Sequence, residues 1–237
     1  MTLKELVVAY FQYYAIQAYL VVAVAGYAYA LTSSASLGRL ALTGLAAGLL
    51  YPLAWYGIHR FILHGNWLAK SPVTAPVWKR IHYDHHQDPH DLHILFGALY
   101  TTLPTVALVS MPVGFALAGW PGAAFGLATG CLITCFYEFC HCVEHLSYKP
   151  RNRILARMKQ LHMAHHFHNE QGNYGITNFG WDRLFGTLYT NDSRPVKSAT
   201  VFNLGYDDAM AERYPWVARL SGGVAKGTPR DRRREAA

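Results

Sequence analysis

Three long uncharged stretches dominate the pattern of hydrophobic and polar positions along the chain. No charged residue occurs from Leu6 to Gly38, from Leu40 to Ile58, or over the 44 residues from Ile94 to Tyr137. A helix needs about 20 apolar residues to cross the hydrocarbon core of a bilayer. The first two stretches therefore predict one span each, and the third predicts two, divided by a turn at Gly119-Trp120-Pro121-Gly122. We expect four transmembrane helices near residues 8–30, 40–58, 95–117 and 123–145.

Basic residues are distributed unevenly among the connections between these predicted spans. The connection between the second and third spans and the region after the fourth are both rich in them, as shown by Arg60, Lys70, Lys79, Arg80, Lys149, Arg151, Arg153, Arg157 and Lys159. The loop between the first two spans holds only Arg39. The positive-inside rule then places both termini and the second connection in the cytoplasm.

Together these patterns predict an all-α integral membrane protein that forms a single domain over residues 1–237. Two transmembrane hairpins would carry a cytoplasmic helical cap made of residues 59–93 and 146–220. A basic, disordered tail is expected over residues 221–237. The first apolar stretch is too long for a signal peptide, so we expect it to remain as an uncleaved span.

Composition supports a membrane protein. The chain is 52% hydrophobic and only 15% charged, whereas about a quarter of residues are charged in ordinary soluble proteins. The net charge is +7, and a basic tail beside apolar spans suits anionic lipid headgroups or serves no binding role; we expect no nucleic-acid partner. The four cysteines lie in one apolar stretch and are expected to pack there without forming disulfides.

Histidines are unusually frequent, and most of them are clustered. The chain has 13, of which ten fall into the sequences HRFILH, HYDHH, HCVEH and HMAHH. These ten are His59, His64, His82, His85, His86, His141, His145, His162, His165 and His166. All four clusters lie at or beyond the predicted cytoplasmic ends of the spans, so the topology brings them to one membrane face.

The spacing within the clusters suits metal ligation. Residues three and four apart share a helix face, so 82/85/86, 141/145 and 162/165/166 can each direct imidazoles at one point. His59 and His64 are five apart, about 140° around an ideal helix, which suits ligands divided between two neighbouring ions. A single histidine is usually a surface or hydrogen-bonded residue, and His90, His93 and His168 fit that interpretation.

The number of ligands narrows the choice of metal. Imidazole binds zinc, iron, copper and nickel alike, but structural zinc takes four ligands. Ten histidines fit two ions with about five ligands each, which favours a redox pair, and two iron ions suit the activation of O₂.

At these residues the sequence resembles the fatty acid hydroxylase / sterol desaturase superfamily of membrane di-iron oxygenases, in its fatty acid 2-hydroxylase-like branch. The similarity runs from about His59 to Thr187 and includes NYGITNFGWDRLFGT after the last histidine cluster. The resemblance implies membrane helices beneath a cytosolic catalytic cap, metal ligation by the ten clustered histidines and a lipid substrate. It also implies that zinc can replace iron in a structure.

The chain departs from some members of that superfamily in two respects. It has no room for a fused haem domain, so a separate electron donor is expected, either a ferredoxin or a small cytochrome with its reductase. The segment DPHDLHI adds His90 and His93, which are not part of the family's histidine clusters.

Several polar residues near the clusters are further candidates. Glu138 and Glu144 flank the third cluster, and Glu138 shares a helix face with His141, where it could orient the ligand or form a polar contact between helices. Asp182 and Asp84 could each orient a histidine or cap a turn. Asn173 and Tyr174 are expected to line the site.

The leading hypothesis is an O₂-dependent lipid hydroxylase that acts on a fatty acyl chain. A sterol-type desaturase or a carotenoid hydroxylase would use similar histidine clusters. A zinc-binding membrane transporter or sensor is the alternative from another class, although a transporter would hold its ligands near the bilayer midplane.

Overall fold

The computed structural model describes residues 1–228 and residue 231, and within them the secondary structure is entirely helical. Five α-helices are the principal elements, namely α1 (Leu3–Gln12), α2 (Tyr14–Thr32), α3 (Leu37–Gly57), α7 (Leu99–His145) and α8 (Arg153–Phe167). The remaining α-helices are short: α4 (Ala75–Trp78), α5 (Asp84–Gln87), α6 (Leu92–Leu95), α9 (Gly180–Leu184), α10 (Asp208–Arg213) and α11 (Trp216–Ser221). Three further helical turns are η1 (Ile58–Leu63), η2 (Trp67–Lys70) and η3 (Lys79–Tyr83), of which η1 and η3 are π-helical.

The chain divides into two compact units. One consists of Met1–Trp55 and Gly97–Val143, and we call it the apolar unit. The other consists of Tyr56–Phe96 and Glu144–Ala237, and we call it the histidine unit. The boundaries fall within α3 and α7, so two long helices run from one unit into the other.

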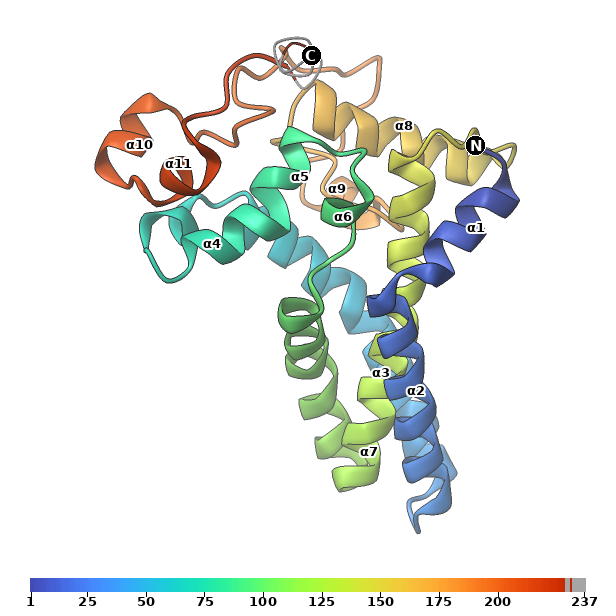
Figure 1. Ribbon diagram of the computed structural model, residues 1–237. Coiled ribbons are helices and arrows are strands. Elements are labelled where there is room, and N and C mark those ends of the chain that lie inside the picture. Colours follow the sequence, from blue (N-terminus) through green and yellow to red (C-terminus); the bar gives the residue numbers. More distant parts are fainter. Residues whose placement is uncertain (229–230, 232–237) are drawn as a thin grey trace. The chain divides into compact units, whose positions relative to one another are not determined.

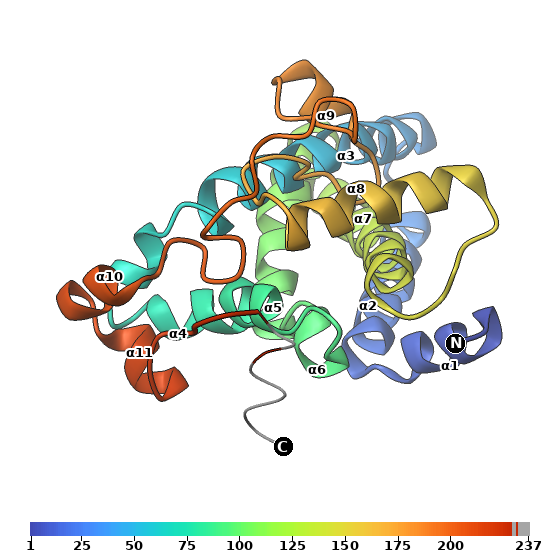
Figure 2. The same cartoon turned by 90° about the horizontal axis from the view of Figure 1, so that it is seen from above.

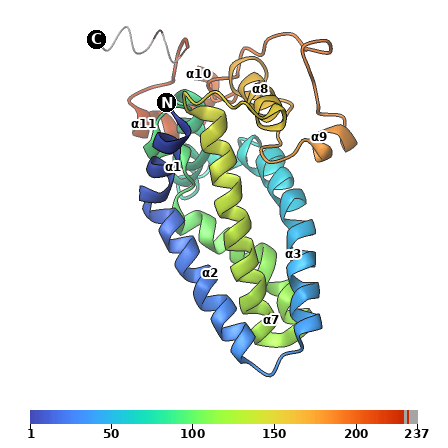
Figure 3. The ribbon, with the colours of Figure 1, turned by 90° about the vertical axis from the view of Figure 1, so that its right-hand side faces the viewer.

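In the part of the chain that the structure describes, three helical segments are long and apolar enough to cross a membrane: Tyr14–Thr32, Leu37–Leu63 and Leu92–His145. In the apolar unit, α2, α3 and α7 run side by side (Figures 1 and 3). Hydroxyl groups join them, since Tyr27 contacts Thr129 at 3.1 Å and Tyr51 contacts Thr134 at 2.5 Å between side-chain oxygens. Such interhelical hydrogen bonds satisfy polar groups that apolar surroundings would leave unpaired.

The helix α7 reverses direction near its middle. Ala118 and Gly119 leave the helical region, and Gly119 has a φ of 61°, which glycine adopts without steric cost. This is the turn that the sequence predicts at residues 119–122. The two halves then pack closely, because a Cβ at Gly126 would lie 2.6 Å from the Ser110 carbonyl oxygen. Small residues of this kind let helix backbones approach each other in membrane proteins.

The first predicted span differs from the structure. A continuous helix is expected over 8–30, but Tyr13 is extended, with a ψ of 125°, and separates α1 from α2 (Figure 3). Two side chains stabilise the interruption. Tyr10 donates its hydroxyl hydrogen to the Cys135 carbonyl at 2.6 Å, and Gln17 donates to the Phe11 carbonyl at 3.0 Å, which lies at the break. These tertiary and local contacts carry no periodic signal in the sequence.

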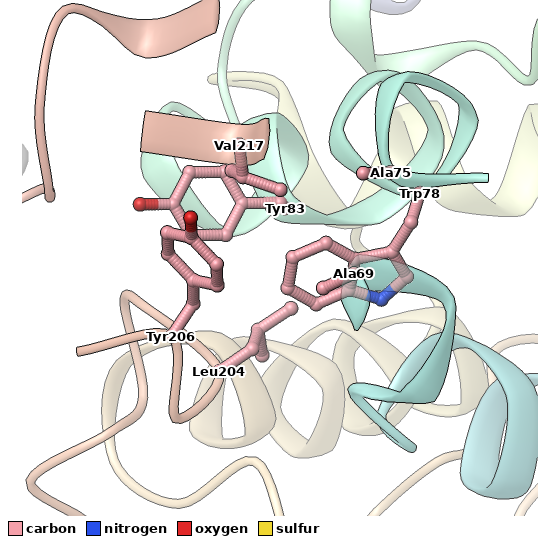
Figure 4. Packing of buried hydrophobic residues seen from close by; sticks show 7 residues of the cluster. All are labelled: Ala69, Ala75, Trp78, Tyr83, Leu204, Tyr206 and Val217. Atoms are coloured by element: carbon pink, nitrogen blue, oxygen red, sulfur yellow. The ribbon is translucent and has the colours of Figure 1, made fainter. Parts of the chain in front are cut away.

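The histidine unit has its own hydrophobic core beside α4. In Figures 1 and 2, α10 and α11 lie next to α4, and Figure 4 shows the buried side chains where they meet. This cluster consists of Ala69, Ala75, Trp78, Tyr83, Leu204, Tyr206 and Val217. The Trp78 indole also donates to the Leu63 carbonyl at 2.7 Å, which fixes the end of η1 next to His64.

The predicted disordered tail, 221–237, falls partly outside the described residues, which omit 229–230 and 232–237. At its beginning, Val224 and Ala225 pack against the cluster around Trp78. Disorder in the rest of the tail stays a prediction.

Candidate metal centre

Nine of the ten clustered histidines belong to the histidine unit, and they are carried by five elements. One lies in the π turn η1 and one directly follows it, three lie on η3 and α5, one ends α7, and three lie on α8. In chain order they are His59, His64, His82, His85, His86, His145, His162, His165 and His166. Eight of these are buried and His64 is half-buried.

The wide turn η1 changes the expected relation between His59 and His64. The backbone N–H of His64 donates to the His59 carbonyl at 3.2 Å, so the hydrogen bond spans five residues rather than four. Residues five apart then lie on nearly the same side, and the two Nε2 atoms are 3.2 Å apart. An ideal α-helix would set the two rings about 140° apart, whereas the π turn brings them together, so the geometry favours one shared ion over two.

His59 and His64 form one group with His82 and His165, in which the four ligand atoms lie within 4.8 Å of one another. We call this the first histidine group. The Nε2 atoms of His82 and His64 are 2.8 Å apart. The His59 and His165 ring centroids are separated by 4.9 Å.

A second group contains His85, His145, His162 and His166, again with ligand atoms within 4.8 Å of one another. The Nε2 atoms of His145 and His162 are 2.8 Å apart. We call this the second histidine group.

His86 adjoins both groups, since it lies within the same distance of His165 and His166. The HYDHH and HMAHH clusters are therefore each divided between the groups. In these two clusters the imidazoles that could share one helix face instead contribute to different groups.

The separations between nitrogens fit coordination to a metal ion. A metal–imidazole bond is about 2.0–2.1 Å long, so neighbouring ligand nitrogens in octahedral or tetrahedral geometry lie about 2.8–3.4 Å apart. The observed contacts of 2.8 and 3.2 Å in the first group and 2.8 Å in the second lie within that range. The histidine groups could therefore hold metal ions.

Backbone carbonyls hold three of the rings by their other nitrogen. His59 Nδ1 lies 2.6 Å from the Tyr174 carbonyl oxygen, His86 Nδ1 lies 2.9 Å from that of Val201, and His165 Nδ1 lies 2.8 Å from that of Gly172. A carbonyl accepts only from a protonated nitrogen, so each ring carries its hydrogen on Nδ1 and leaves the Nε2 lone pair available. Metal-binding histidines are oriented in this way.

Burial keeps the imidazoles neutral. It holds the pKa values of His64, His82 and His166 well below the ordinary range for histidine, and the neighbouring imidazoles act in the same direction. Burial likewise lowers the pKa of His86 to about 3, against a smaller opposing effect of the hydrogen bond to Val201. Neutral imidazole is the form that binds a metal.

Two of these rings have buried nitrogens that form no hydrogen bond with the described residues. Within the described residues, His86 Nε2 and both ring nitrogens of His166 are buried and have no hydrogen-bond partner. An unsatisfied buried polar group costs about 1–3 kcal/mol. A bound cation would remove that cost, so this donor set fits a metal.

The buried carboxylate of Asp182 organises the segment that supports the first group. It accepts hydrogen bonds from the backbone N–H groups of Tyr174 and Gly175, both at 2.8 Å, and from the Thr187 hydroxyl at 2.7 Å. Asp182 therefore acts on His59 indirectly, by fixing the residue whose carbonyl holds that ring.

Asn173 and Tyr174 are also buried, and they have different roles. The Asn173 side chain ties α8 to the segment that follows, because it donates to the Leu161 and Tyr189 carbonyls at 3.3 and 3.1 Å. The Tyr174 ring faces the first group, with its centroid 5.3 Å from that of His64.

The remaining candidate acids differ in their surroundings. Asp84 does not orient a histidine, because both of its oxygens accept from Lys79 at 2.8 Å. Glu138, in the apolar unit, accepts from the Gly97 N–H at 3.1 Å and lies 4.0 Å from His141 Nδ1, too far for a hydrogen bond. Glu144, in the histidine unit, is fully buried.

His141 is the tenth clustered histidine and belongs to the apolar unit. It is buried and lies one turn before His145 on the same helix. Residues four apart on a helix lie on one face.

The three histidines outside the four sequence clusters are also absent from both histidine groups. His90 Nδ1 contacts the His145 carbonyl oxygen at 2.7 Å, and His168 Nε2 contacts that of Pro195 at 2.7 Å. His93 is exposed. These positions agree with the interpretation of all three as hydrogen-bonded or surface residues.

Sequence reasoning missed the supporting carbonyls of Gly172, Tyr174 and Val201. The first two lie in or next to the NYGITNFGWDRLFGT segment, whose similarity to known proteins marked it as important. Val201 had no such signal, because a backbone carbonyl can come from any residue type.

Comparison with known proteins finds a family and relatives that are described as fatty acid or fatty acyl hydroxylases. A model of the family described as fatty acid hydroxylase matches residues 44–187. The ceramide very long chain fatty acid hydroxylase SCS7 of Saccharomyces cerevisiae is 30% identical over 151 residues, which cover 61% of this chain and 37% of that protein. The dihydroceramide fatty acyl 2-hydroxylase FAH2 of Arabidopsis thaliana is 30% identical, with 68% of each chain covered.

A solved structure is also similar. It is described as full-length scs7p with only the hydroxylase domain visible, and it matches 78% of this chain and 68% of its own with a TM-score of 0.65 and 28% identity. The chain spans well under half the length of the Saccharomyces relative and of the fatty acid 2-hydroxylase of Rattus norvegicus, of which it covers 39%.

Proposed function

The chain belongs to the fatty acid hydroxylase family, and from that premise we propose that it is an integral membrane oxygenase that hydroxylates a C–H bond of a lipid acyl chain. The observation that carries the proposal is the pair of adjoining histidine groups. Their rings are held neutral, and within each group neighbouring ring nitrogens lie 2.8–3.2 Å apart, as ligands of one metal ion would. Relatives named as ceramide and fatty acyl hydroxylases support the choice of substrate class.

We assign the metal ligands to the two groups and to His86. The first ion would bind His59, His64, His82 and His165, and the second would bind His85, His145, His162 and His166. His86 adjoins both, and His141 is proposed as the tenth ligand because it shares a helix face with His145. Two iron ions held there would supply the O₂-dependent oxidation of an unactivated C–H bond, which no side chain can perform.

Other features of the chain then support the metal ligands in three ways. The carbonyls of Gly172, Tyr174 and Val201 hold ligand rings in the orientation and tautomer that a metal requires. Burial excludes water from the ligands and keeps them unprotonated. Asp182 fixes the segment that supplies the Tyr174 carbonyl.

We further propose four membrane spans, with both termini and the histidine unit in the cytoplasm. The reversal of α7 at Ala118 and Gly119 supports two spans within that helix. The distribution of basic residues supports the orientation. Electrons would come from a separate protein, a ferredoxin or a small cytochrome with its reductase.

Lipid mass spectrometry of cells with and without the gene tests the proposed reaction. A hydroxylated acyl lipid should be lost when the gene is removed, and it should return with the intact gene but not with a His165→Ala variant. Loss of an unsaturated lipid instead would indicate a desaturase. An unchanged lipid profile would count against lipid oxidation altogether.

A further inference from the structure

Arg60 is a half-buried cation beside the first histidine group. Its guanidinium donates one hydrogen bond, to the Tyr56 hydroxyl at 2.9 Å. Within the described residues, no carboxylate oxygen lies within 4.0 Å of it. A guanidinium has five N–H donors, so most of its hydrogen-bonding capacity is left for something outside the protein.

Arg60 acts on the buried acid Asp182 only at a distance: its charge works to lower the pKa of that carboxyl, against the larger raising effect of burial. Asp182 already accepts hydrogen bonds from Tyr174, Gly175 and Thr187. Arg60 lies three residues before the end of the candidate span Leu37–Leu63, a position from which a long basic side chain can reach the membrane–water interface.

A single aromatic ring separates this guanidinium from the histidines. The Arg60 Cζ atom lies 6.0 Å from the centroid of the Tyr174 ring. That centroid lies 5.3 Å from His64, 5.6 Å from His59 and 5.7 Å from His165, measured between ring centroids. A ligand bound to Arg60 would therefore hold its polar end about one aromatic ring away from the first histidine group.

The surface around Arg60 is apolar and exposed. Phe61 lies beneath the guanidinium at 5.0 Å and is 61% exposed, and Phe185 stacks on Tyr56 at 5.4 Å and is 48% exposed. Leu184, which precedes Phe185 in the chain, is 68% exposed. A cation surrounded by exposed aromatic and aliphatic side chains matches an amphiphile with an oxygen-bearing end and a hydrocarbon chain.

We propose that Arg60 is a positioning residue that binds the carbonyl or carboxylate oxygen of an acyl lipid, whose hydrocarbon chain contacts the apolar surface formed by Phe61, Leu184 and Phe185. This inference rests on the proposed function for its substrate class. It adds a specificity determinant, because lipids without an oxygen at the end of the acyl chain would lack the anchoring contact.

Equilibrium binding to zinc-loaded protein in lipid nanodiscs tests the inference without any turnover. The probes are palmitate, an N-palmitoyl sphingoid base and hexadecane, which share one chain length and differ at the polar end. Arg60→Gln should weaken binding of the preferred carbonyl lipid by about ten- to a hundredfold, the usual effect of losing a charged hydrogen bond. Hexadecane binding and the metal content should not change.

Two further variants complete the design. Arg183→Gln removes an exposed arginine of α9 and should leave binding unchanged, because a positioned contact depends on geometry rather than on total charge. Arg60→Lys keeps the charge and should recover part of the affinity. If palmitate binds best, the ligand is a free fatty acid; if the sphingoid lipid binds best, the ligand is an amide-linked acyl chain.

The inference would be overturned if Arg60→Gln weakened hexadecane and palmitate binding equally, or if Arg183→Gln had the same effect as Arg60→Gln. Should Arg60→Gln lose metal, Arg60→Lys with full metal content replaces it in the comparison. Equal weakening of hexadecane and carbonyl-lipid binding by Arg60→Lys would then overturn the inference. Failure of the proposed function is distinguishable, since it would appear as absence of lipid oxidation by iron-loaded wild-type protein while binding still depended on Arg60.

Discussion

At the scale of the residue, the site depends as much on backbone carbonyls as on histidine side chains. Each carbonyl that accepts from an Nδ1 decides which nitrogen faces the metal position. The sequence identifies the imidazoles because histidine has a distinctive chemistry. It does not identify Val201, whose contribution depends only on where its carbonyl lies.

Replacing a proposed ligand and an exposed histidine in turn should show which histidines bind metal. We expect His165→Ala to lower the bound metal per chain and abolish turnover, because its ring belongs to the first group and adjoins His86. His93→Ala should change the metal content little, because His93 is exposed and outside both groups. Elemental analysis of both purified variants measures this, and equal metal losses would contradict the division of the histidines.

Asp182→Asn tests indirect support of a ligand. The amide can accept through one oxygen, but its NH₂ group would face the donors from Tyr174, Gly175 or Thr187. We expect a loss of about 1–3 kcal/mol in the free energy of unfolding, the cost of an unsatisfied buried hydrogen bond, together with weaker metal retention. Asp192→Asn, at an exposed position in the chain segment that follows, is the control. Metal retention identical in the two variants would show that Asp182 does not support the site.

At the scale of the element, π turns decide which histidines meet. A periodicity of 3.6 residues separates His59 from His64, whereas the five-residue hydrogen bond in η1 brings them together. Nothing in HRFILH distinguishes a π turn from an α-helical one. By contrast, the reversal of α7 could be predicted, because Gly119-Trp120-Pro121-Gly122 breaks a helix for local reasons.

The close packing of the two halves of α7 gives a prediction about helix assembly. Gly126→Ala would place a Cβ 2.6 Å from the Ser110 carbonyl oxygen, so the halves must separate. We expect a loss of about 1–3 kcal/mol, typical of overpacking. Gly48→Ala is the matched control in another apolar helix, because a Cβ there meets nothing within 4 Å. Thermal unfolding in detergent compares them, and equal melting temperatures would contradict the packing described for α7.

At the scale of the whole molecule, the sequence predicts an all-helical membrane protein with clustered histidines. It cannot predict contacts between distant segments. His59 is held by Tyr174 and His86 by Val201, each pair 115 residues apart in the chain. The break at Tyr13 likewise depends on a contact between Tyr10 and Cys135. Such pairings follow from how the chain folds in three dimensions, which a local pattern does not contain.

Metal removal should destabilise the protein, because bound ions offset the cost of the unsatisfied nitrogens of His86 and His166. At a free metal concentration one hundred times the dissociation constant, one site contributes about 2.7 kcal/mol. We expect a chelator to lower the melting temperature and added iron or zinc to restore it. The His165→Ala variant should respond much less, and a melting temperature independent of metal would contradict a built metal site.

The central proposal is that this chain inserts oxygen from O₂ into a lipid acyl chain. The most direct measurement is turnover by purified, iron-loaded protein in vesicles with a chemical reductant, acyl lipids and isotopically heavy O₂, followed by mass spectrometry. We predict one heavy oxygen atom in a hydroxyl group of the lipid product, and no such product from His165→Ala. Lipid that remains unoxidised, a double bond without oxygen insertion, or a hydroxyl oxygen derived from water would each contradict the claim.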